Sequence, residues 1–454
     1  MGRSLMDRLR SLEQSVRQNV QSTAPSANDH PSGDSNEVLR HLAENKATFA
    51  EADSGRTEEL SPERSLSEAA FEPCLTPYGR CWRRKTSFDL YTKHGHYLFA
   101  DILATDFAGL SKLAKSQIDV ERLRFYDVET NGLGTGAGTF PFLHTIGCID
   151  EDEFIVTQYF VDDYDAEAAV LFAIGENHLL DDAIIVTFNG KSFDWPLLQN
   201  RRVMHQFPRL ERVQLDLLHP SRRLFKGQLS RVKLVDLEEH VLGLTRIDDL
   251  PGGEAPERYF RYLDTRDVRD VEPVFGHNVL DVCSLVTLQV AIARLLNGEQ
   301  KDLPSQTHIA LATWYDAWHD IHAAGASYEA AVSASDADWK SHWLYSMFLK
   351  RRRDDHAACQ VWWTMAREYP DHIEPLVELA KCYEHRQKDL DLALQTAEEA
   401  LRRIVQVKQP TFHIPHRVSS SDDSLGQTPA DPLAVALKHR IQRIERKRSR
   451  LKRD

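Results

Sequence analysis

FYDVETNGL, residues 125–133, is the stretch from which the fold of this chain is predicted. Its apolar residues indicate a buried strand, and two carboxylates, Asp127 and Glu129, stand two positions apart near its end. Side chains at i and i+2 of a strand point to the same face of a sheet. The two carboxylates would therefore repel one another unless a cation lies between them. A divalent metal ion is the usual partner of such a pair.

The segments that follow predict an α/β domain. Three consecutive strands come first, then a helix, another strand and further helices, which is the order of the ribonuclease H-like fold. We expect a mixed sheet flanked by helices. The strands are expected at 121–129, 143–150, 153–161 and 183–189, and the helices at 165–180, 194–204, 233–243 and 271–297.

A third acid, Asp194, stands where the strand at 183–189 runs through Asn189 and Gly190 into a helix. Pro196 suits the first turn of that helix, where its missing N–H costs nothing. Asp194 would lie at or near the helix N-cap, so one interpretation is that it only caps the helix. The other is that it joins the first two acids.

A fourth acid, Asp281, lies on the predicted helix at 271–297, four residues after His277. Positions i and i+4 share one face of a helix. Asp281 stands beside an apolar stripe, and a buried lone carboxylate is costly unless it is paired or binds metal. Four acids at the ends of two strands and on a helix suit two Mg²⁺ or Mn²⁺ ions with oxygen ligands. His277 is the natural general base for a metal-bound water.

A glycine-rich segment at 132–139, GLGTGAGT, follows the first acid pair. It lacks the G-x-x-x-x-G-K-[ST] spacing of a nucleotide-binding P-loop. It is better explained as a loop that lets the backbone approach a ligand closely.

These motifs resemble the three exonuclease motifs of the DEDD superfamily, and more fully the YprB-type family of ribonuclease H-like exonucleases. The resemblance covers roughly residues 85–297, and four segments carry it: NGKSFD at 189–194, DLLHPSRR at 216–223, DDLPG at 248–252 and HNVLDVCSL at 277–285. It implies that Asp127, Glu129, Asp194 and Asp281 are metal ligands and that His277 is the base. Three residues separate His277 from Asp281, which is the spacing of the members that use tyrosine.

The resemblance also implies substrate contacts. Leu133 matches a residue that wedges beside the terminal base, and Asn189 matches one that contacts the substrate. Lys191, Arg222 and Arg223 are further candidates. The segment 201–233 holds nine Lys or Arg against two acids in a chain of net charge -13, which suits a phosphate backbone. Alternatively, Arg222 and Arg223 are buried partners of Asp216 or Asp236.

Length and composition limit the number of domains and the classes of function that this chain can have. The chain of 454 residues has room for two or three domains, and its net negative charge excludes nucleic-acid binding by bulk electrostatics. Six scattered cysteines without C-x-x-C spacing suit a reducing compartment. We expect no signal peptide, no myristoylation and no apolar run near the roughly 20 residues that span a bilayer, hence a cytoplasmic protein with no membrane partner.

Four regions are expected. They are an N-terminal helix with a disordered linker at 1–73, the ribonuclease H-like domain at 74–298, a helical region at 305–407 and a flexible basic tail at 408–454. In the helical region, Ala358 and Ala393 begin similar patterns 35 residues apart, close to the tetratricopeptide period. A plain helical hairpin is the alternative. Repeats of this kind would offer a site for a protein partner. The basic tail would either follow phosphates or form a solvated helix end.

The predicted function is a metal-dependent 3′–5′ exonuclease that hydrolyses single-stranded nucleic acid by a two-metal mechanism. Two alternatives remain open. One is a nucleic-acid-binding or scaffold protein built on a nuclease fold, and the other is an RNase H-type endonuclease. The sequence does not decide between DNA and RNA, because recognition of the 2′-OH depends on tertiary contacts.

Overall fold

The structure, a computed structural model, describes residues 37–42, 63–132, 138–247, 249–251, 253–300, 302–407 and 432–451. It divides into two compact units, residues 1–301 and 302–454. The helix expected at 1–20 lies outside the described residues.

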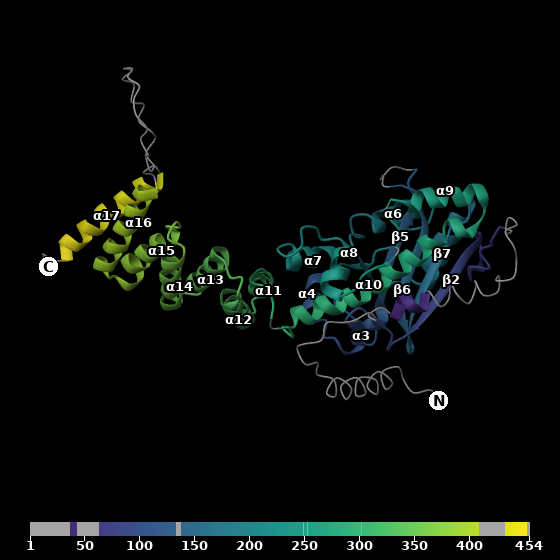
Figure 1. The fold of residues 1–454 in the computed structure, drawn as a ribbon, viewed down its shortest axis with the longest axis horizontal. Helices are drawn as coiled ribbons and strands as arrows, with labels where there is room; N and C mark the ends of the chain where they lie inside the picture. The colour runs from purple at the N-terminus through teal and green to yellow at the C-terminus, as the bar shows by residue number, and fades with distance from the viewer. Residues whose placement is uncertain are drawn as a thin grey trace, which may run out of the picture. The chain divides into compact units, whose positions relative to one another are not determined.

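The first unit is built on a mixed sheet of seven strands, which confirms the predicted fold class (Figure 1). In spatial order the strands are β1 (Glu72–Thr76), β2 (Gly79–Asp89), β7 (Glu153–Phe160), β6 (Pro141–Asp150), β5 (Leu123–Thr130), β8 (Ile184–Thr187) and β9 (Val213–Asp216). Neighbours from β1 to β5 pair antiparallel, whereas β5, β8 and β9 are parallel. The carboxyl ends of β5, β8 and β9 therefore meet at one edge, where ligands bind in α/β sheets.

Helices cover both faces of this sheet. The long helix α10 (Glu272–Leu296) packs on β5 and β6 (Figure 1). Asp127 on β5 points toward this helix. Helix α5 (Glu167–Asn177) packs on the other face, where the core includes Tyr126 and Tyr159. The alternation of side chains along β5 thus places Asp127 and Glu129 on the face toward α10, together with the buried Phe125, and Tyr126 and Val128 on the other face.

The first unit contains further short elements. They are β3 (Lys93–His94), β4 (Tyr97–Leu98), α3 (Asp101–Ala104), α4 (Ala108–Ala114), α6 (Asp194–Met204), α7 (Leu218–Phe225), α8 (Leu234–Leu237) with the π-helical turn η4 (Glu238–Leu242), and α9 (Ala255–Thr265). Short 3-10 turns lie at η2 (Val120–Arg122), η3 (Tyr164–Ala166) and η5 (Val268–Asp270). The strands β1, β2 and β9 were not predicted from the sequence. β2 contains the charged run RRKTS, and β9 has only four residues.

Part of the expected disordered linker is folded. Leu66 and Ala69 are buried in the core of the first unit, and Arg64 pairs with Glu272 at 2.9 Å. Residues 37–42 are helical, with Val38 fully buried. The prediction of disorder was wrong at these places, because a few apolar side chains in a polar segment suffice to dock it.

The second unit is a series of helices, each packed against the next in sequence. They are α11 (Ser305–Ala317), α12 (Ile321–Ser333), α13 (Trp339–Arg351), α14 (Asp355–Glu368), α15 (Glu374–Cys382) with the π-helical turn η6 (Tyr383–Gln387), α16 (Leu390–Val407) and α17 (Pro432–Leu451). Ala358 on α14 and Ala393 on α16 are both fully buried. The π-helical turn η6 lies between these two alanines in the chain. The helical region is confirmed, and its kinship to tetratricopeptide repeats stays a prediction.

The C-terminal segment was expected to be flexible, but residues 432–451 form α17, which packs on α16. Three of its cations, on Arg440, Arg443 and Lys447, pair with the buried carboxylate of Glu384 at 2.7–2.8 Å. Opposite charge inside the unit therefore orders part of the basic tail. Residues 408–431 lie outside the described residues.

Helix α10 also corrects the expectation about apolar runs. It is long and apolar enough to cross a membrane by length and composition alone. However, 89% of its most apolar window is buried inside the structure, as in the central helix of a folded domain.

Candidate active site

Asp127 and Glu129 lie side by side on β5 and face α10. The side-chain amide of Asn278 on α10 donates a hydrogen bond to Asp127 Oδ2 at 2.5 Å. The amide oxygen of Asn278 accepts one from the hydroxyl of Thr145 on β6. Because Asn278 is fully buried, it fixes the orientation of the Asp127 carboxylate.

Asp194 is the first residue of α6 and is 7% exposed. The N-cap position belongs to Phe193, and within the described residues the Asp194 carboxylate accepts no hydrogen bond. The interpretation that Asp194 only caps the helix is therefore wrong. A Cβ on Gly190 would lie 2.7 Å from Asp194 Oδ2, so only glycine lets the loop pass this close to the carboxylate.

The loop before α6 is held by a further acid, Asp216, at the end of β9. Its carboxylate accepts hydrogen bonds from the backbone N–H groups of Asn189 at 2.8 Å and Lys191 at 3.2 Å. It also accepts one from the N–H of Leu218 at 3.0 Å. Asp216 thus fixes the strand-to-helix turn that presents Asp194.

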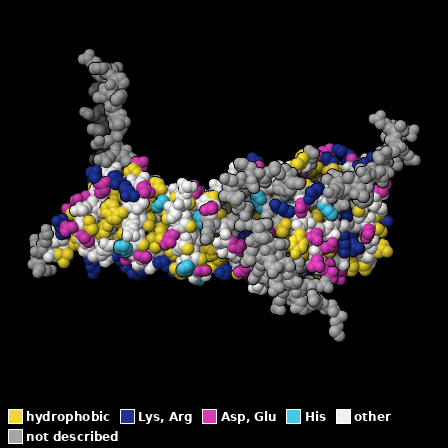
Figure 2. Space-filling model, turned by 60° about the horizontal axis from the view of Figure 1, so that its bottom comes forward, with side chains coloured by type: hydrophobic (Ala, Val, Ile, Leu, Met, Phe, Trp, Pro, Cys, Tyr) yellow, Lys and Arg dark blue, Asp and Glu magenta, His cyan; other side chains and the backbone are white. Residues whose placement is uncertain are grey.

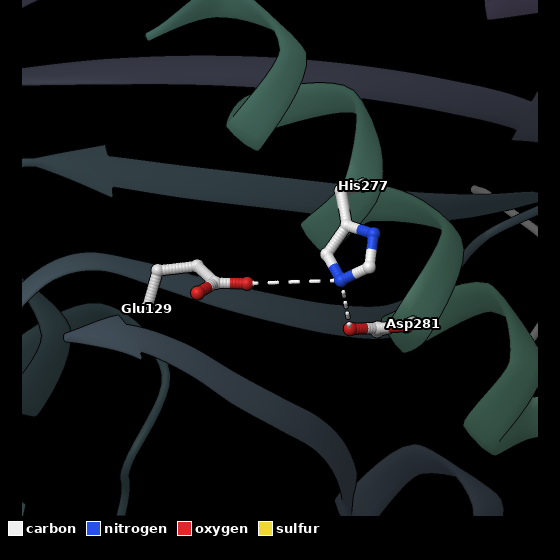
Figure 3. Close-up of side chains that lie close together, drawn as sticks. All are labelled: Glu129, His277 and Asp281. Carbon is white, nitrogen blue, oxygen red and sulfur yellow. Dashed lines mark ion pairs between the residues drawn. The ribbon is translucent and has the colours of Figure 1, made fainter. Parts of the chain in front are cut away.

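His277 and Asp281 lie one turn apart on α10 and complete the group (Figure 3). His277 Nε2 is 3.4 Å from Asp281 Oδ2 and 4.0 Å from Glu129 Oε1. One ligand atom from each of these three residues lies within 4.8 Å of the others. The imidazole nitrogen therefore points between a β5 carboxylate and an α10 carboxylate.

Burial and neighbouring carboxylates raise the pKa values of Asp127, Glu129 and Asp194. Burial, and then the charges of Asp281, Asp194 and Glu129, hold the pKa of Asp127 well above its usual range. Burial and the Asp281 carboxylate raise the pKa of Glu129 to about 7. Burial and the Asp216 carboxylate raise the pKa of Asp194 to about 8. The acids thus converge closely enough to disfavour full ionisation without a cation.

Two residues of the site escaped the sequence analysis as functional candidates. Asp249 accepts a hydrogen bond from His277 Nδ1 at 2.6 Å. Arg246 pairs with Asp281 and reaches His277 Nδ1 at 3.1 Å. Asp249 lies in the motif at 248–252, so its motif was a usable signal. Arg246 is a lone arginine after Gly243, and nothing in its neighbourhood marks it.

The site fits a divalent cation. Asp194 is a buried carboxylate without a hydrogen-bond partner in the described chain, and the pKa values of Asp127 and Glu129 are raised by like charges. Such groups are relieved by a hard cation that takes oxygen ligands. Asp127, Glu129, Asp194 and Asp281 supply those oxygens, and the imidazole of His277 adjoins them. The identity of the metal and the number of ions stay predictions.

Four of the five predicted substrate-binding residues lie in the described part of the chain. Asn189 and Lys191 lie in the loop that leads to Asp194, and both are exposed. Arg222 and Arg223 lie exposed on α7, after β9. Leu133 lies outside the described residues.

The basic segment 201–233 divides into two parts. Its first arginines are structural: Arg201 pairs with buried Glu167, and Arg212 donates to the carbonyl of Leu179 at 2.8 Å. That the exposed arginines of α7 contact a phosphate backbone is a proposal. On the face drawn in Figure 2, basic and acidic side chains are interspersed, and the coloured part of that face shows no continuous basic patch.

Comparison with known proteins agrees with this geometry. Residues 124–293 match the RNase H superfamily, a span that contains the four acids and His277. The "Uncharacterized protein YprB" of Bacillus subtilis (strain 168) is 31% identical over 333 residues, which are 71% of this chain and 80% of that protein. An RNase H superfamily domain suggests a nuclease that acts on nucleic acid and uses divalent metal. The chain belongs to the YprB family and contains an RNase H superfamily domain.

Proposed function

We propose that the protein is a metal-dependent 3′–5′ exonuclease that hydrolyses phosphodiester bonds of single-stranded DNA or RNA. The observation that carries the proposal is the convergence of Asp127, Glu129, Asp194 and Asp281 at one sheet edge, beside His277. Two divalent ions, when bound, would stabilise the attacking and leaving oxygens of the displacement. Mg²⁺ and Mn²⁺ both suit the oxygen ligands.

The chain's own residues supply the proton chemistry. Asp249 accepts the Nδ1–H of His277, which leaves Nε2 as the nitrogen that faces Glu129 and Asp281. In this tautomer Nε2 is free to take a proton from an attacking water. Asn278 holds Asp127 in its orientation, and the turn at Gly190 presents Asp194. Asn189, Lys191, Arg222 and Arg223 are the proposed contacts to the strand.

The test uses single-stranded DNA and RNA labelled at either end, with Mg²⁺ or Mn²⁺, and the full chain. We expect stepwise shortening from the 3′ end that EDTA abolishes. Asp127→Asn should lower the rate by at least about 100-fold, since it removes a metal ligand. Asp371→Asn, at an exposed acid of the second unit, is the matched control. An unchanged rate in Asp127→Asn would refute the proposal.

The same assay separates the alternatives. Internal fragments, above all from an RNA strand paired with DNA, would identify an RNase H-type endonuclease. Salt-dependent binding without cleavage, retained in Asp127→Asn, would identify a nucleic-acid-binding or scaffold protein. Capture of a protein partner by the helical unit, and location in the cytoplasm, stay predictions.

A further inference from the structure

A buried arginine lies among the acids of the site. Arg246 is 5% exposed and follows the π-helical turn η4. Its guanidinium forms a two-pronged pair with Glu238, from Nε to Oε2 at 2.7 Å and from Nη2 to Oε1 at 2.5 Å. The side chain of Glu238 is 1% exposed and also accepts a hydrogen bond from the hydroxyl of Ser284 at 2.5 Å.

The other side of the guanidinium faces the candidate ligands. Nη2 pairs with Asp281 Oδ1, and Nη1 lies 3.1 Å from His277 Nδ1 and 3.4 Å from Asp249 Oδ2. Asp281 and Ser284 are three residues apart on α10. The pair of Arg246 and Glu238 is therefore tied to α10 at two points, and one of these is a carboxylate of the site.

Two roles are compatible with a cation in this place. In the first, Arg246 is a competing cation that occupies the position of a metal ion and must leave before the ion binds. In the second, it stays in place and holds Asp281. The pair with Glu238 favours the second role, because withdrawal of Arg246 would leave the buried carboxylate of Glu238 without a cation, which is costly.

We propose that Arg246 is a positioning residue that stays on Asp281 Oδ1 and leaves Oδ2 as the oxygen that Asp281 offers to a divalent ion. Oδ2 is the oxygen that faces His277 Nε2. The inference rests on the proposed function, since it concerns the same metal site. It adds a fixed resident cation that orients one ligand and stays when metal binds.

The two roles predict opposite effects on metal affinity. In the first role, loss of Arg246 removes a competing cation and tightens metal binding. Loss of a partner that orients a ligand weakens metal binding, typically by about 10- to 100-fold. Arg246→Lys keeps the positive charge but lacks the planar fork that matches a carboxylate. This variant therefore separates orientation from charge.

The experiment is a titration of the metal-free full-length protein with Mn²⁺, in which free Mn²⁺ is measured by electron paramagnetic resonance without nucleic acid. We expect Arg246→Lys to weaken Mn²⁺ binding at least about 10-fold. The paired change Arg246→Gln with Glu238→Gln, which removes the buried Glu238 carboxylate together with its cation, should do the same. Arg261→Gln is the control, because Arg261 is 51% exposed on α9.

Affinity that is unchanged or tighter in both Arg246 variants would overturn the inference. A lower melting temperature of the metal-free variants, with Mn²⁺ affinity unchanged, would show a merely structural role and overturn it as well. If the wild-type protein bound no Mn²⁺, the proposed function and the inference would fail together. If it bound Mn²⁺ in a manner sensitive to Asp127→Asn but not to Arg246→Lys, the inference alone would fail.

Discussion

At the scale of single residues, His277 shows how neighbours select a tautomer. Its Nδ1 lies 2.6 Å from a carboxylate oxygen of Asp249 and 3.1 Å from Nη1 of Arg246. A guanidinium can only donate and a carboxylate can only accept, so the shorter contact places the proton of Nδ1 on the side of Asp249. The pKa of His277 is raised, because Asp281 and Asp249 outweigh the opposing effects of burial and Arg246.

Asp249→Asn should remove the carboxylate that orients the imidazole of His277. We expect activity to fall by about 10- to 100-fold, as for other groups that orient a residue at a metal site. Because the Asp249 carboxylate raises the pKa of His277, the acid limb of the pH–rate profile should move to lower pH. Steady-state rates over a range of pH test this, with Asp264→Asn, at an exposed acid of α9, as control. A profile that keeps its shape and height would contradict the assigned role.

The raised pKa values of Glu129 and Asp194 predict the pH dependence of stability without metal. Their folded pKa values, about 7 and about 8, exceed the usual values of 4.5 and 3.8. Between these limits the folded state binds more protons than the unfolded chain, so stability falls as pH rises. In EDTA the first unit should melt at a lower temperature at pH 8.5 than at pH 5.5. Asp194→Asn should flatten this trend, and saturating Mg²⁺ should reduce it. A steeper trend in Asp194→Asn would contradict the prediction.

At the scale of elements, the small hairpin of β3 and β4 supports the π-helical turn η4, which precedes Arg246 in the chain. The strands β3 and β4 pair with each other, and the N–H of His96 between them donates to the carbonyl of Leu242 at 2.8 Å. Gly95 has φ +67°, and a Cβ there would lie 2.1 Å from the Leu242 carbonyl oxygen. The hairpin can therefore reach η4 only if this residue is glycine.

Gly95→Ala should destabilise the first unit by more than the strain of the backbone alone. A non-glycine residue at positive φ costs about 1–2 kcal/mol, and the contact with Leu242 adds to that cost. Gly298→Ala is the matched control, because Gly298 has φ +71° and a Cβ there would meet nothing within 4 Å. Denaturant unfolding of both variants measures the difference. Equal losses would show that the close approach to Leu242 does not constrain the hairpin.

At the scale of the whole molecule, the two units have separate cores. One hydrophobic cluster lies within residues 66–275 and another within residues 312–444. The candidate metal site belongs to the first unit. The second unit buries the carboxylate of Glu384 against cations of α17, which lower its pKa to about 2 despite the opposing effect of burial.

Calorimetry of the full chain should therefore show two separable transitions. Mg²⁺ should raise the transition of the first unit and leave the other unchanged, since a ligand stabilises only the unit that binds it. Glu384→Gln should lower the free energy of unfolding of the second unit by about 1–3 kcal/mol, and with it the transition temperature, because the cations of α17 lose a buried partner. Glu368→Gln, at a carboxylate 44% exposed, is the control. A Mg²⁺-dependent shift in both transitions would show that the units unfold together.

The sequence by itself determined the class of the fold and the position of its main elements. Strong apolar runs near Asp127, at 143–161 and in α10 left little ambiguity. It also singled out the four acids and His277, because each stands at the end of a strand or beside a core-facing stripe. Short or charged strands such as β2 and β9 escaped, because only their pairing in the sheet makes them strands.

Only the tertiary structure decided what surrounds the acids. Asp249 and Arg246 come from a turn that lies 28 and 31 residues before His277, and no local pattern ties them to His277 and Asp281. The folding of residues 63–70 and of α17 likewise depends on partners far away, Glu272 for Arg64 and Glu384 for Arg443. The physical reason is the same in each case. Periodicity records which side of an element is buried, whereas a salt bridge or hydrogen bond depends on groups that only the folded chain brings together.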